Sequence, residues 1–302
     1  TDDTALTARV SLTGTGAAAG DSVRLYDGTT ELGSAVTLTS TDISAGFKDI
    51  PTGTLTNATT YALNAKITDL AGNTSAASAS FALTIDTTAP SAPSITSAAD
   101  NVGTVTGTLA TASRTDDTNL SVRVSLAGTS AVAGDKVALF NGASALGSAQ
   151  ALTATDITNG YADVATGTLA NATTYAITAK VTDAAGNASA ASIAFTTTVD
   201  TTAPNAPAIT LAADDVGSVT TALSNNSRTD DTNLLVRVSL AGTGAAAGDS
   251  ARLFDGGTAI GTLTALTATD ISNGYVEIAS GTLTEAAHVL TARITDDVGN
   301  SS

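Results

Sequence analysis

The sequence repeats itself with an offset of 114 residues, and this repetition restricts the folds open to it more than any other feature. The stretch RTDDTNL at 114–120 recurs letter for letter at 228–234, and the chain opens on the related TDDTAL. The segment 155–192 likewise matches 41–78. A repeat of this length indicates a tandem array of one structural unit.

Proline-rich segments separate the copies. DTTAPSAP at 86–93 and DTTAPNAP at 200–207 hold four of the five prolines. Because proline fixes φ and is excluded from central strands, we predict short, stiff connectors here. The predicted domains are 1–89, 90–203 and 204–302. Only the second is a whole repeat, since the first lacks its first strand and the third its last. We therefore expect the sequence to be a window on a longer tandem protein.

Within each repeat the apolar residues alternate with polar ones, and no helical period is visible. In NLSVRVSLAG, the residues Leu120, Val122, Val124 and Leu126 share one face of a predicted strand. Short alternating strands between Gly, Asn and Asp turns predict β-sandwiches. The fold class is therefore predicted to be all-β, with tandem immunoglobulin-like sandwiches arranged end to end as a rod.

A second motif supports the same fold. LTNATTY at 55–61 and LANATTY at 169–175 resemble the tyrosine corner of immunoglobulin-like and fibronectin-like sandwiches. In the third copy this corner is one residue shorter and has His288 in place of the tyrosine. We expect His288 to miss the tyrosine's hydrogen-bond partner and the third repeat to be the weakest. Tyr26, Phe140 and Phe254, one per repeat, are predicted to pack in the core.

Composition excludes several functions. With a net charge of −16 the chain is predicted to bind no nucleic acid, and no apolar run is long enough for direct membrane insertion. Without cysteine there are no disulfides and no thiol chemistry, and His288 is the only histidine. Lys66 and Lys180 become Arg293 in the third copy and point outward, which argues against a Lys–Asn crosslink. The chain is predicted not to be an enzyme.

The paired aspartates point to calcium. In seven-strand sandwich topology, Asp116, Asp117 and Asp200 share the end of the repeat where the chain leaves, facing the TDDVGN turn of the next repeat. The first junction is predicted to combine Asp2, Asp3 and Asp86 with Asp100, whereas the position of Asp214 and Asp215 stays open. Carboxylates about 4 Å apart repel by roughly 4 kcal/mol at an effective dielectric of 20. A hard cation would remove that cost, and Ca²⁺ accepts six to eight oxygens in irregular geometry. The alternative is that these aspartates only cap turns and solvate loops.

Other aspartates have a simpler interpretation. Those of the TDI and GD motifs are predicted to cap turns, which aspartate commonly does. They are Asp42, Asp156 and Asp270, and Asp21, Asp135 and Asp249. The aspartates of the TD–GN turns, Asp69, Asp183 and Asp296, are either Asx-turn residues or metal ligands.

The motifs DTTAP, ADDVG, TDDT and TDAAGN, in this order in one unit, resemble bacterial immunoglobulin-like repeats. Such repeats form the extender regions of giant biofilm-associated and RTX-type adhesins, where calcium makes the linkers rigid. The resemblance covers the whole chain and implies a monomeric rod at the bacterial cell surface, outside the cell, whose partners are calcium and the neighbouring repeats. It implies calcium ligation by Asp2, Asp3, Asp86, Asp100, Asp116, Asp117, Asp200, Asp214, Asp215, Asp230 and Asp231; we add Asp183 and Asp296 as candidates. The alternative function is a ligand-binding adhesion module for carbohydrate or protein.

Overall fold

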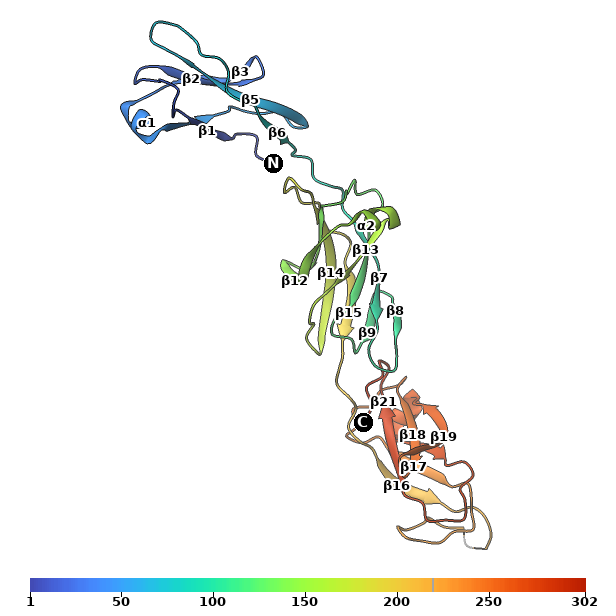
Figure 1. Cartoon of the computed structure of the whole chain (residues 1–302). Coiled ribbons are helices and arrows are strands. Elements are labelled where there is room, and N and C mark those ends of the chain that lie inside the picture. The colour runs from blue at the N-terminus through green and yellow to red at the C-terminus, as the bar shows by residue number, and fades with distance from the viewer. Residues whose placement is uncertain (219) are drawn as a thin grey trace.

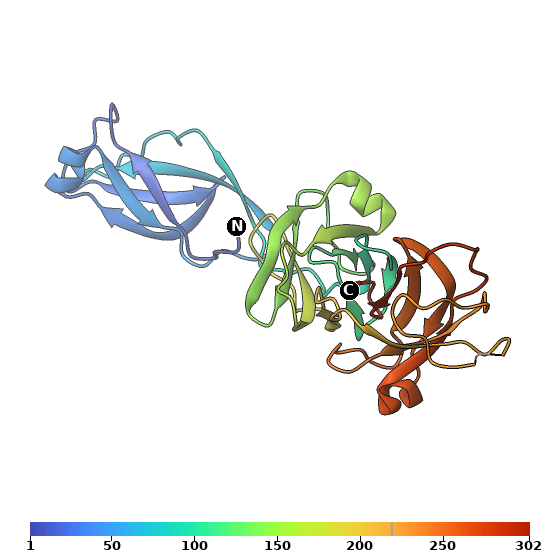
Figure 2. The same cartoon turned by 90° about the horizontal axis from the view of Figure 1, so that it is seen from below.

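The computed structural model describes residues 1–218 and 220–302 and shows tandem β-sandwiches that follow one another end to end (Figures 1 and 2). We call the sandwich built from β1 to β6 module 1, that of β7 to β15 module 2, and that of β16 to β21 module 3. The predicted all-β class with immunoglobulin-like sandwiches is confirmed. Among the described helices, none is long and apolar enough to cross a membrane.

Module 2 has two sheets that face each other. One has the order β13-β10-β7-β8 and the other β12-β11-β14-β15-β9. All neighbours pair antiparallel except β15 and β9, which are parallel. The elements are β7 (Ser94–Asp100), β8 (Gly107–Leu109), β9 (Ser113–Thr115), β10 (Ser121–Ser125), β11 (Lys136–Asn141), β12 (Ser144–Ala151), α2 (Ala154–Asn159), β13 (Tyr161–Ala165), β14 (Thr173–Thr182) and β15 (Phe195–Val199).

Modules 1 and 3 repeat parts of this arrangement in the described residues. The sheets of module 1 are β1-β4 and β3-β2-β5-β6, and those of module 3 are β16-β17-β20 and β19-β18-β21. Module 1 consists of β1 (Thr7–Ser11), β2 (Ser22–Asp27), β3 (Thr30–Thr37), α1 (Ser40–Ala45), β4 (Phe47–Pro51), β5 (Thr59–Thr68) and β6 (Phe81–Ile85). Module 3 consists of β16 (Ala208–Ala213), β17 (Leu235–Ser239), β18 (Ser250–Asp255), β19 (Thr258–Ala265), α3 (Ala268–Asn273), β20 (Tyr275–Ala279) and β21 (Leu290–Thr295).

The alternation in the sequence becomes the burial pattern of the strands. Leu120, Val122, Val124 and Leu126 are buried in module 2 and face Ile177 and its neighbours across the core. Burial of apolar surface on this scale is the main force that holds such a sandwich together. Each module has its own cluster of buried residues, and module 1 divides its core into two.

The three short helices are the one element type that the sequence did not predict. Each is capped by a threonine side chain that accepts from the third helical residue, and an aspartate there accepts from the threonine backbone in return. These aspartates are Asp42, Asp156 and Asp270, so the prediction that they act as caps fits the structure. Six residues are too few to show a helical period.

Six aromatic rings lie on the outer faces of the sheets rather than in the core. The prediction for Tyr26, Phe140 and Phe254 was wrong, because each is only half-buried and lies under the cation of Lys66, Lys180 or Arg293. Arg9, Arg123 and Arg237 cover three further rings in the same way. A cation above the ring lets an aromatic residue remain at the surface.

The tyrosine corners form as predicted. The backbone N–H of Thr56 donates to the Tyr61 hydroxyl oxygen at 2.8 Å, and that of Ala170 donates to the Tyr175 hydroxyl oxygen at 2.7 Å. Both tyrosines are buried. Each bond ties the long central strand back to the loop that precedes it.

His288 closes the shortened corner of module 3, contrary to our expectation. Its Nε2 lies 2.8 Å from the carbonyl oxygen of Thr284, the residue equivalent to Ala170, and its Nδ1 lies 2.7 Å from Asp255 Oδ2. The imidazole therefore contacts Thr284, the position that a tyrosine would contact, but it bonds to the backbone carbonyl, whereas the tyrosine hydroxyl bonds to the backbone N–H. The Thr284 carbonyl and the Asp255 carboxylate both raise the pKa of His288, and the His288 ring lowers the pKa of Asp255.

The pair of His288 and Asp255 predicts that module 3 is most stable at mildly acidic pH. The stabilisation from His288 is complete below its unfolded pKa of about 6.5 and is lost as pH rises through the higher folded value. That from Asp255 is complete above about 4 and is lost as pH falls through its lowered folded value. Amide hydrogen exchange of module 3 in the full chain, corrected for the intrinsic rate, should therefore show greater protection at pH 5.5 than at pH 8.5. Module 2 serves as the internal control. Equal protection of module 3 at the two pH values would refute the stabilising role of His288. So would a protection difference in His288→Gln that is as large as in the wild type.

Candidate functional site: the joints between modules

Each connector is fixed to the module that precedes it. The N–H of Asp200 donates to the carbonyl of Thr115 at 2.8 Å, and that of Asp86 donates to the carbonyl of Thr1 at 2.9 Å. The Asn171 side chain then accepts from the N–H of Thr201 and donates to the Thr202 hydroxyl. Asn57 makes the same two contacts with Thr87 and Thr88. The motif DTT is thus held in place before the chain enters the next module.

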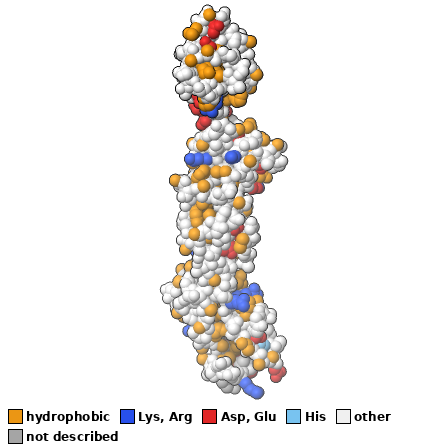
Figure 3. All heavy atoms as spheres, turned by 60° about the vertical axis from the view of Figure 1, so that its left-hand side comes forward, with side chains coloured by type: hydrophobic (Ala, Val, Ile, Leu, Met, Phe, Trp, Pro, Cys, Tyr) orange, Lys and Arg blue, Asp and Glu red, His pale blue; other side chains and the backbone are white. Residues whose placement is uncertain are grey.

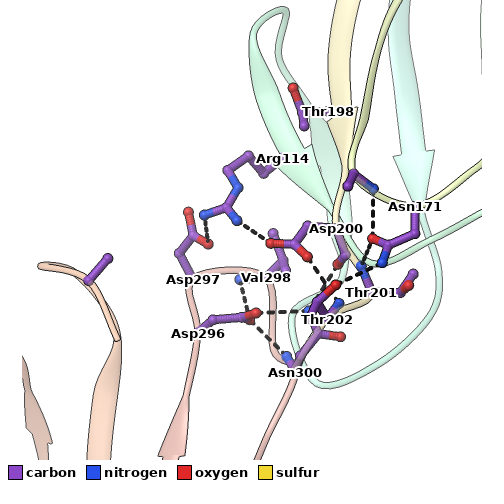
Figure 4. Close-up of polar contacts among 12 residues, drawn as sticks. Arg114, Asn171, Thr198, Asp200, Thr201, Thr202, Asp296, Asp297, Val298 and Asn300 are labelled. Carbon is purple, nitrogen blue, oxygen red and sulfur yellow. Dashed lines mark hydrogen bonds and ion pairs between the residues drawn. The ribbon is translucent and has the colours of Figure 1, made fainter. Parts of the chain in front are cut away.

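The same contact crosses both joints. At the first joint, the side-chain amide of Asn187 in module 2 donates to the backbone carbonyl of Asp86 at 2.9 Å. At the second joint, Asn300 in module 3 donates to the carbonyl of Asp200, also at 2.9 Å (Figure 4). The asparagine of the TD–GN turn therefore makes the same side-chain contact from module 2 and from module 3 to the connector before it.

The aspartates Asp183 and Asp296 hold these asparagines. Asp296 Oδ1 accepts from the backbone N–H groups of Val298, Gly299 and Asn300, and its Oδ2 accepts from the Asn300 side chain at 2.8 Å. Asp183 makes the equivalent bonds in module 2. Both aspartates therefore form Asx turns, and they lie at the joints as well, so neither of the two predicted roles excludes the other.

The connectors also bond to the module that follows. Ser91 N–H donates to the Thr129 carbonyl at 2.9 Å, and Asn205 N–H donates to the Thr243 carbonyl at 2.8 Å. Each joint encloses an open cavity, of ≈ 310 Å³ at the first and ≈ 340 Å³ at the second. Equivalent residues line the two cavities, among them the connector proline and the aspartate of the GD motif.

Four carboxylates at the second joint influence one another electrostatically. Burial raises the pKa of Asp116, and the negative charges of Asp100, Asp117 and Asp296 add to the effect. Asp100 and Asp117 are buried, with 6% and 2% of their surface exposed. The structure therefore places Asp116 and Asp117 at the end of module 2 that faces module 3, as the sequence predicted.

Asp100 lies at the second joint, not at the first as predicted. It is the last residue of β7, which runs from the end where the chain enters module 2 to the end where it leaves. There its Oδ2 accepts from the Thr115 hydroxyl at 2.6 Å. Asp214 is placed in the same way in module 3, where it accepts from Thr229 at 2.8 Å. Asp214, Asp230 and Asp231 are therefore at the far end of module 3, and Asp215 is exposed nearby in the sequence.

Two glycines leave room for the first aspartate of each TDD motif. A Cβ at Gly103 would lie 2.1 Å from Asp116 Oδ2, and one at Gly217 would lie 2.3 Å from Asp230 Oδ2. Both glycines have positive φ, at 73° and 77°. The glycine of ADNVG (99–103) and of ADDVG (213–217) is thus required by the backbone angle and by the neighbouring carboxylate.

Two carboxylate oxygens are buried without a hydrogen-bond donor among the described residues. They are Oδ1 of Asp116 and Oδ2 of Asp231, and 5% of the Asp231 surface is exposed. A buried carboxylate oxygen that lacks a partner is costly, unless a cation or water completes its coordination. The paired aspartates therefore do have oxygens to offer a metal ion.

The first joint has fewer carboxylates. Asp86 accepts from the N–H of Thr88, and Asp3 accepts from the N–H of Ala5. Asp2 approaches the TD–GN turn of module 2, since a Cβ at Gly186 would lie 3.8 Å from its Oδ2. In residues 1–218 and 220–302, no three His, Cys, Asp or Glu side chains are already arranged closely enough to hold a metal ion.

An arginine lies among the carboxylates of the second joint, where the sequence predicted none. Arg114 forms an ion pair with Asp200 of its own module and donates to Asp297 of module 3 at 2.6 Å (Figure 4). Asp297 has no acidic counterpart at the first joint, where the equivalent residue is Ala184. The second joint is therefore partly neutralised by the protein itself.

The sequence assigned no individual role at the joints to five residues, although the TDDVGN turn was placed there: Arg114, Asn187, Asp249, Asp297 and Asn300. Burial raises the pKa of Asp249, and the charges of Asp296 and Asp297 add to it, which places this GD aspartate near the second joint. Asn187 and Asn300 had a usable signal, because the TD–GN motif keeps its asparagine in every copy. Arg114 directly precedes TDDT, but its partner Asp200 lies 86 positions later in the sequence, so no local pattern reveals the pair.

No protein-family model matches the sequence. The chain is 35% identical over 289 residues to exoglucanase B of Cellulomonas fimi, which covers 92% of the chain. The chain spans 22% of that protein's length.

Two solved structures resemble the chain loosely. The FN1–FN3 domains of chicken CNTN1 match with a TM-score of 0.34 and 10% identity, over 94% of this chain and 86% of that one. The Bacteroides ovatus mixed-linkage glucan utilization locus protein SGBP-B, solved with a mixed-linkage heptasaccharide, matches with a TM-score of 0.22 and 15% identity, over 98% and 59%. Superpositions this loose carry no argument about function.

Proposed function

We propose that the chain is a non-catalytic extracellular spacer whose domains, 1–89, 90–203 and 204–302, are held end to end by defined joints. The observation that carries this proposal is the contact repeated at both joints, from Asn187 to Asp86 and from Asn300 to Asp200. A flexible tether would not need the same side-chain bond at each connector. The chain thus fits a segment that holds other modules at a distance.

We propose Ca²⁺ as the ion that stiffens the second joint. Asp100, Asp116, Asp117 and Asp296 offer only oxygen donors, which suit a hard cation. The buried Oδ1 of Asp116 lacks a donor, and Gly103 leaves space beside the same carboxylate. Arg114 already neutralises Asp200, so Asp200 is the least available of the predicted ligands at this joint. Asp2, Asp3 and Asp86 would serve the first joint, and Asp214, Asp215, Asp230 and Asp231 the far end of module 3.

The parent protein is a separate proposal. The motifs resemble extender repeats of a large bacterial surface adhesin, whereas the similarity to exoglucanase B links the chain to a carbohydrate-active protein. Both imply a location outside the cell. In either parent, the structure suits a spacer between a functional module and its anchor.

A carbohydrate-binding function is the second candidate. The similarity to exoglucanase B supports this alternative better than it supports an adhesin extender. Affinity electrophoresis of the full chain through gels with soluble β-glucan separates the two functions. Retardation by the glucan would favour a carbohydrate-binding module. Equal mobility in gels with and without the glucan would favour the spacer.

Small-angle X-ray scattering tests the spacer and its calcium joints. With Ca²⁺ present we expect a narrow distribution of lengths near 100 Å, since strands rise about 3.3 Å per residue and three sandwiches are stacked. After chelation the carboxylates repel one another, and the distribution should broaden or its maximum should shorten. Mg²⁺ at the same concentration is the control, because it fits an irregular oxygen cluster poorly. Superimposable profiles, with calcium binding verified by calorimetry, would contradict the mechanical role of the ion.

A further inference from the structure

Two groups of basic side chains lie on the outer faces of the sheets, and they differ in how their charges are neutralised. In the first group, each arginine lies on the outer face of one sheet and pairs with an acidic residue on the adjacent strand. These pairs are Arg9 with Asp49, Arg123 with Asp163 and Arg237 with Glu277. Their charges are cancelled locally.

The second group lies on the outer face of the opposite sheet, and in module 3 its charges are not cancelled. Arg252 on β18 and Arg293 on β21 are cross-strand partners in the antiparallel register. The neighbours of Arg252 along β18, Ala251 and Leu253, are buried, so Arg252 is on the outer face. Across the part of the chain that the structure describes, neither arginine forms an ion pair with a carboxylate.

The Phe254 ring holds Arg293 in place without neutralising it. The Arg293 guanidinium carbon lies 4.7 Å from the centre of the ring. Arg252 Nε is buried and finds no hydrogen-bond partner within the described residues. A cation–π contact restricts the side chain but leaves the guanidinium edge free to bind an anion.

The other modules show what is different in module 3. In module 1 the equivalent Arg24 forms an ion pair with Glu31, whose counterpart in module 3 is Ala259. In module 2 the arginine is replaced by Ala138, which leaves Lys180 opposite it. Module 3 alone among the three combines two arginines at these positions with the loss of the acid. Figure 3 shows basic side chains in a few separate groups, which fits local sites rather than a continuous basic surface.

We propose that the outer face of β18 and β21, with Arg252, Arg293 and Phe254, binds the carboxylates of an acidic polysaccharide. Two like charges on directly opposed residues destabilise a sheet unless a counter-ion compensates them. A planar guanidinium matches a carboxylate with two parallel hydrogen bonds. The proposal rests on the carbohydrate-binding candidate above and names a charged sugar polymer as its ligand.

The net charge of the chain does not prevent this. At physiological ionic strength charges farther apart than about 8 Å are largely screened, so only acids in the immediate neighbourhood of this face oppose anion binding. The nearest acid on β18, Asp255, is bound to His288 at 2.7 Å. Nucleic acid fits less well, because its dense charge, one per about 1.7 Å of duplex, would extend beyond two arginines onto acidic surface.

Affinity electrophoresis of the full chain in gels with polygalacturonate tests the proposal, with a chelator present so that calcium cannot bridge polymer and protein. We expect retardation by polygalacturonate and none by its fully methyl-esterified form, which has the same backbone without charge. The double substitution R252Q/R293Q should weaken binding by about tenfold or more, because both guanidinium–carboxylate contacts are lost. The matched control R123Q/R237Q removes two arginines from the opposite sheet and should bind as the wild type does. Circular dichroism verifies that each variant is folded.

Several outcomes would overturn the site. Retardation of R252Q/R293Q by polygalacturonate as strong as that of the wild type would do so. The same would follow if R123Q/R237Q lost as much retardation as R252Q/R293Q. Equal retardation by the methyl ester would show that charge is not recognised. Equal retardation by single-stranded DNA would replace an acidic polysaccharide with polyanions in general. None of these results changes the length distribution from scattering, so the site and the spacer can fail independently.

Discussion

Replacing Asp116 and Asp117 together with asparagine should remove calcium binding at the second joint. Both side chains belong to the carboxylate group that converges there, and Asp116 carries the buried oxygen without a donor. Calcium affinity varies over several decades with the number of charged ligands, so we expect a loss of about a hundredfold or more. Isothermal titration of the full chain should show fewer ions bound per molecule.

The control for this experiment is D156N/D270N. It removes two carboxylates as well, but these cap α2 and α3 by accepting from Thr153 and Thr267, and among the described residues they bond to no connector residue. The calcium stoichiometry of this variant should equal that of the wild type. If D116N/D117N keeps both the wild-type stoichiometry and affinity, these residues do not ligate calcium and the proposed site at the second joint is wrong.

The fold was predictable because its signals are local. Alternation in residues 120–126 and the leucine-to-tyrosine spacing of the corner both act within a few residues, and they lead to the strand and the hydrogen bond that the structure shows. The aspartate clusters were partly predictable for the same reason. Once the strand order is assumed, chain direction alone decides at which end of the sandwich Asp116 and Asp117 lie.

The misplacement of Asp100 shows where this reasoning fails. The sequence does not reveal whether ADNVG begins or ends the first strand, and that choice moves the carboxylate from one joint to the other. The structure shows that β7 ends at Asp100. Only the pairing of β7 with β10 and β8 fixes the length of the strand, and such pairing depends on residues distant in the sequence.

The outward aromatic residues were mispredicted for a related reason. One ring per repeat looks like core packing, because large apolar side chains are usually buried. Phe254 instead occupies the outer face of its strand, where Arg293 from a strand 35 or more residues later covers it. A cross-strand cation can be predicted only when the register is known. His288 is similar, since the Asp255 that holds it lies on β18, 33 positions earlier in the sequence.

The two joints share one design but differ in charge. Both use an asparagine that donates to the carbonyl of a connector aspartate. Among the described residues, Arg114 lies between carboxylates of two modules at the second joint, whereas Ala184 replaces Asp297 at the first. The second joint should therefore keep more of its geometry without calcium than the first. Its remaining stiffness should fall with ionic strength, because salt screens exposed ion pairs.

The double substitution R114A/N300A should release the second joint and leave the first unchanged. It removes the ion pairs of Arg114 and the Asn300 bond across the joint, together worth on the order of 2 kcal/mol. Such a loss changes the population of the ordered arrangement by about thirtyfold. The chain has no cysteine, so spin labels can be introduced at the equivalent exposed positions Ser34, Ser148 and Thr262.

Distances between labels at Ser148 and Thr262 report on the second joint, and those between Ser34 and Ser148 on the first. In chelator, R114A/N300A should broaden the distance distribution between Ser148 and Thr262. The distribution between Ser34 and Ser148 should stay as in the wild type. Asn187→Ala should have the opposite effect, because its contact with Asp86 belongs to the first joint. A distribution across the second joint that stays as narrow as in the wild type would mean that connector backbone bonds, such as Asn205 to Thr243, set the geometry without these side chains.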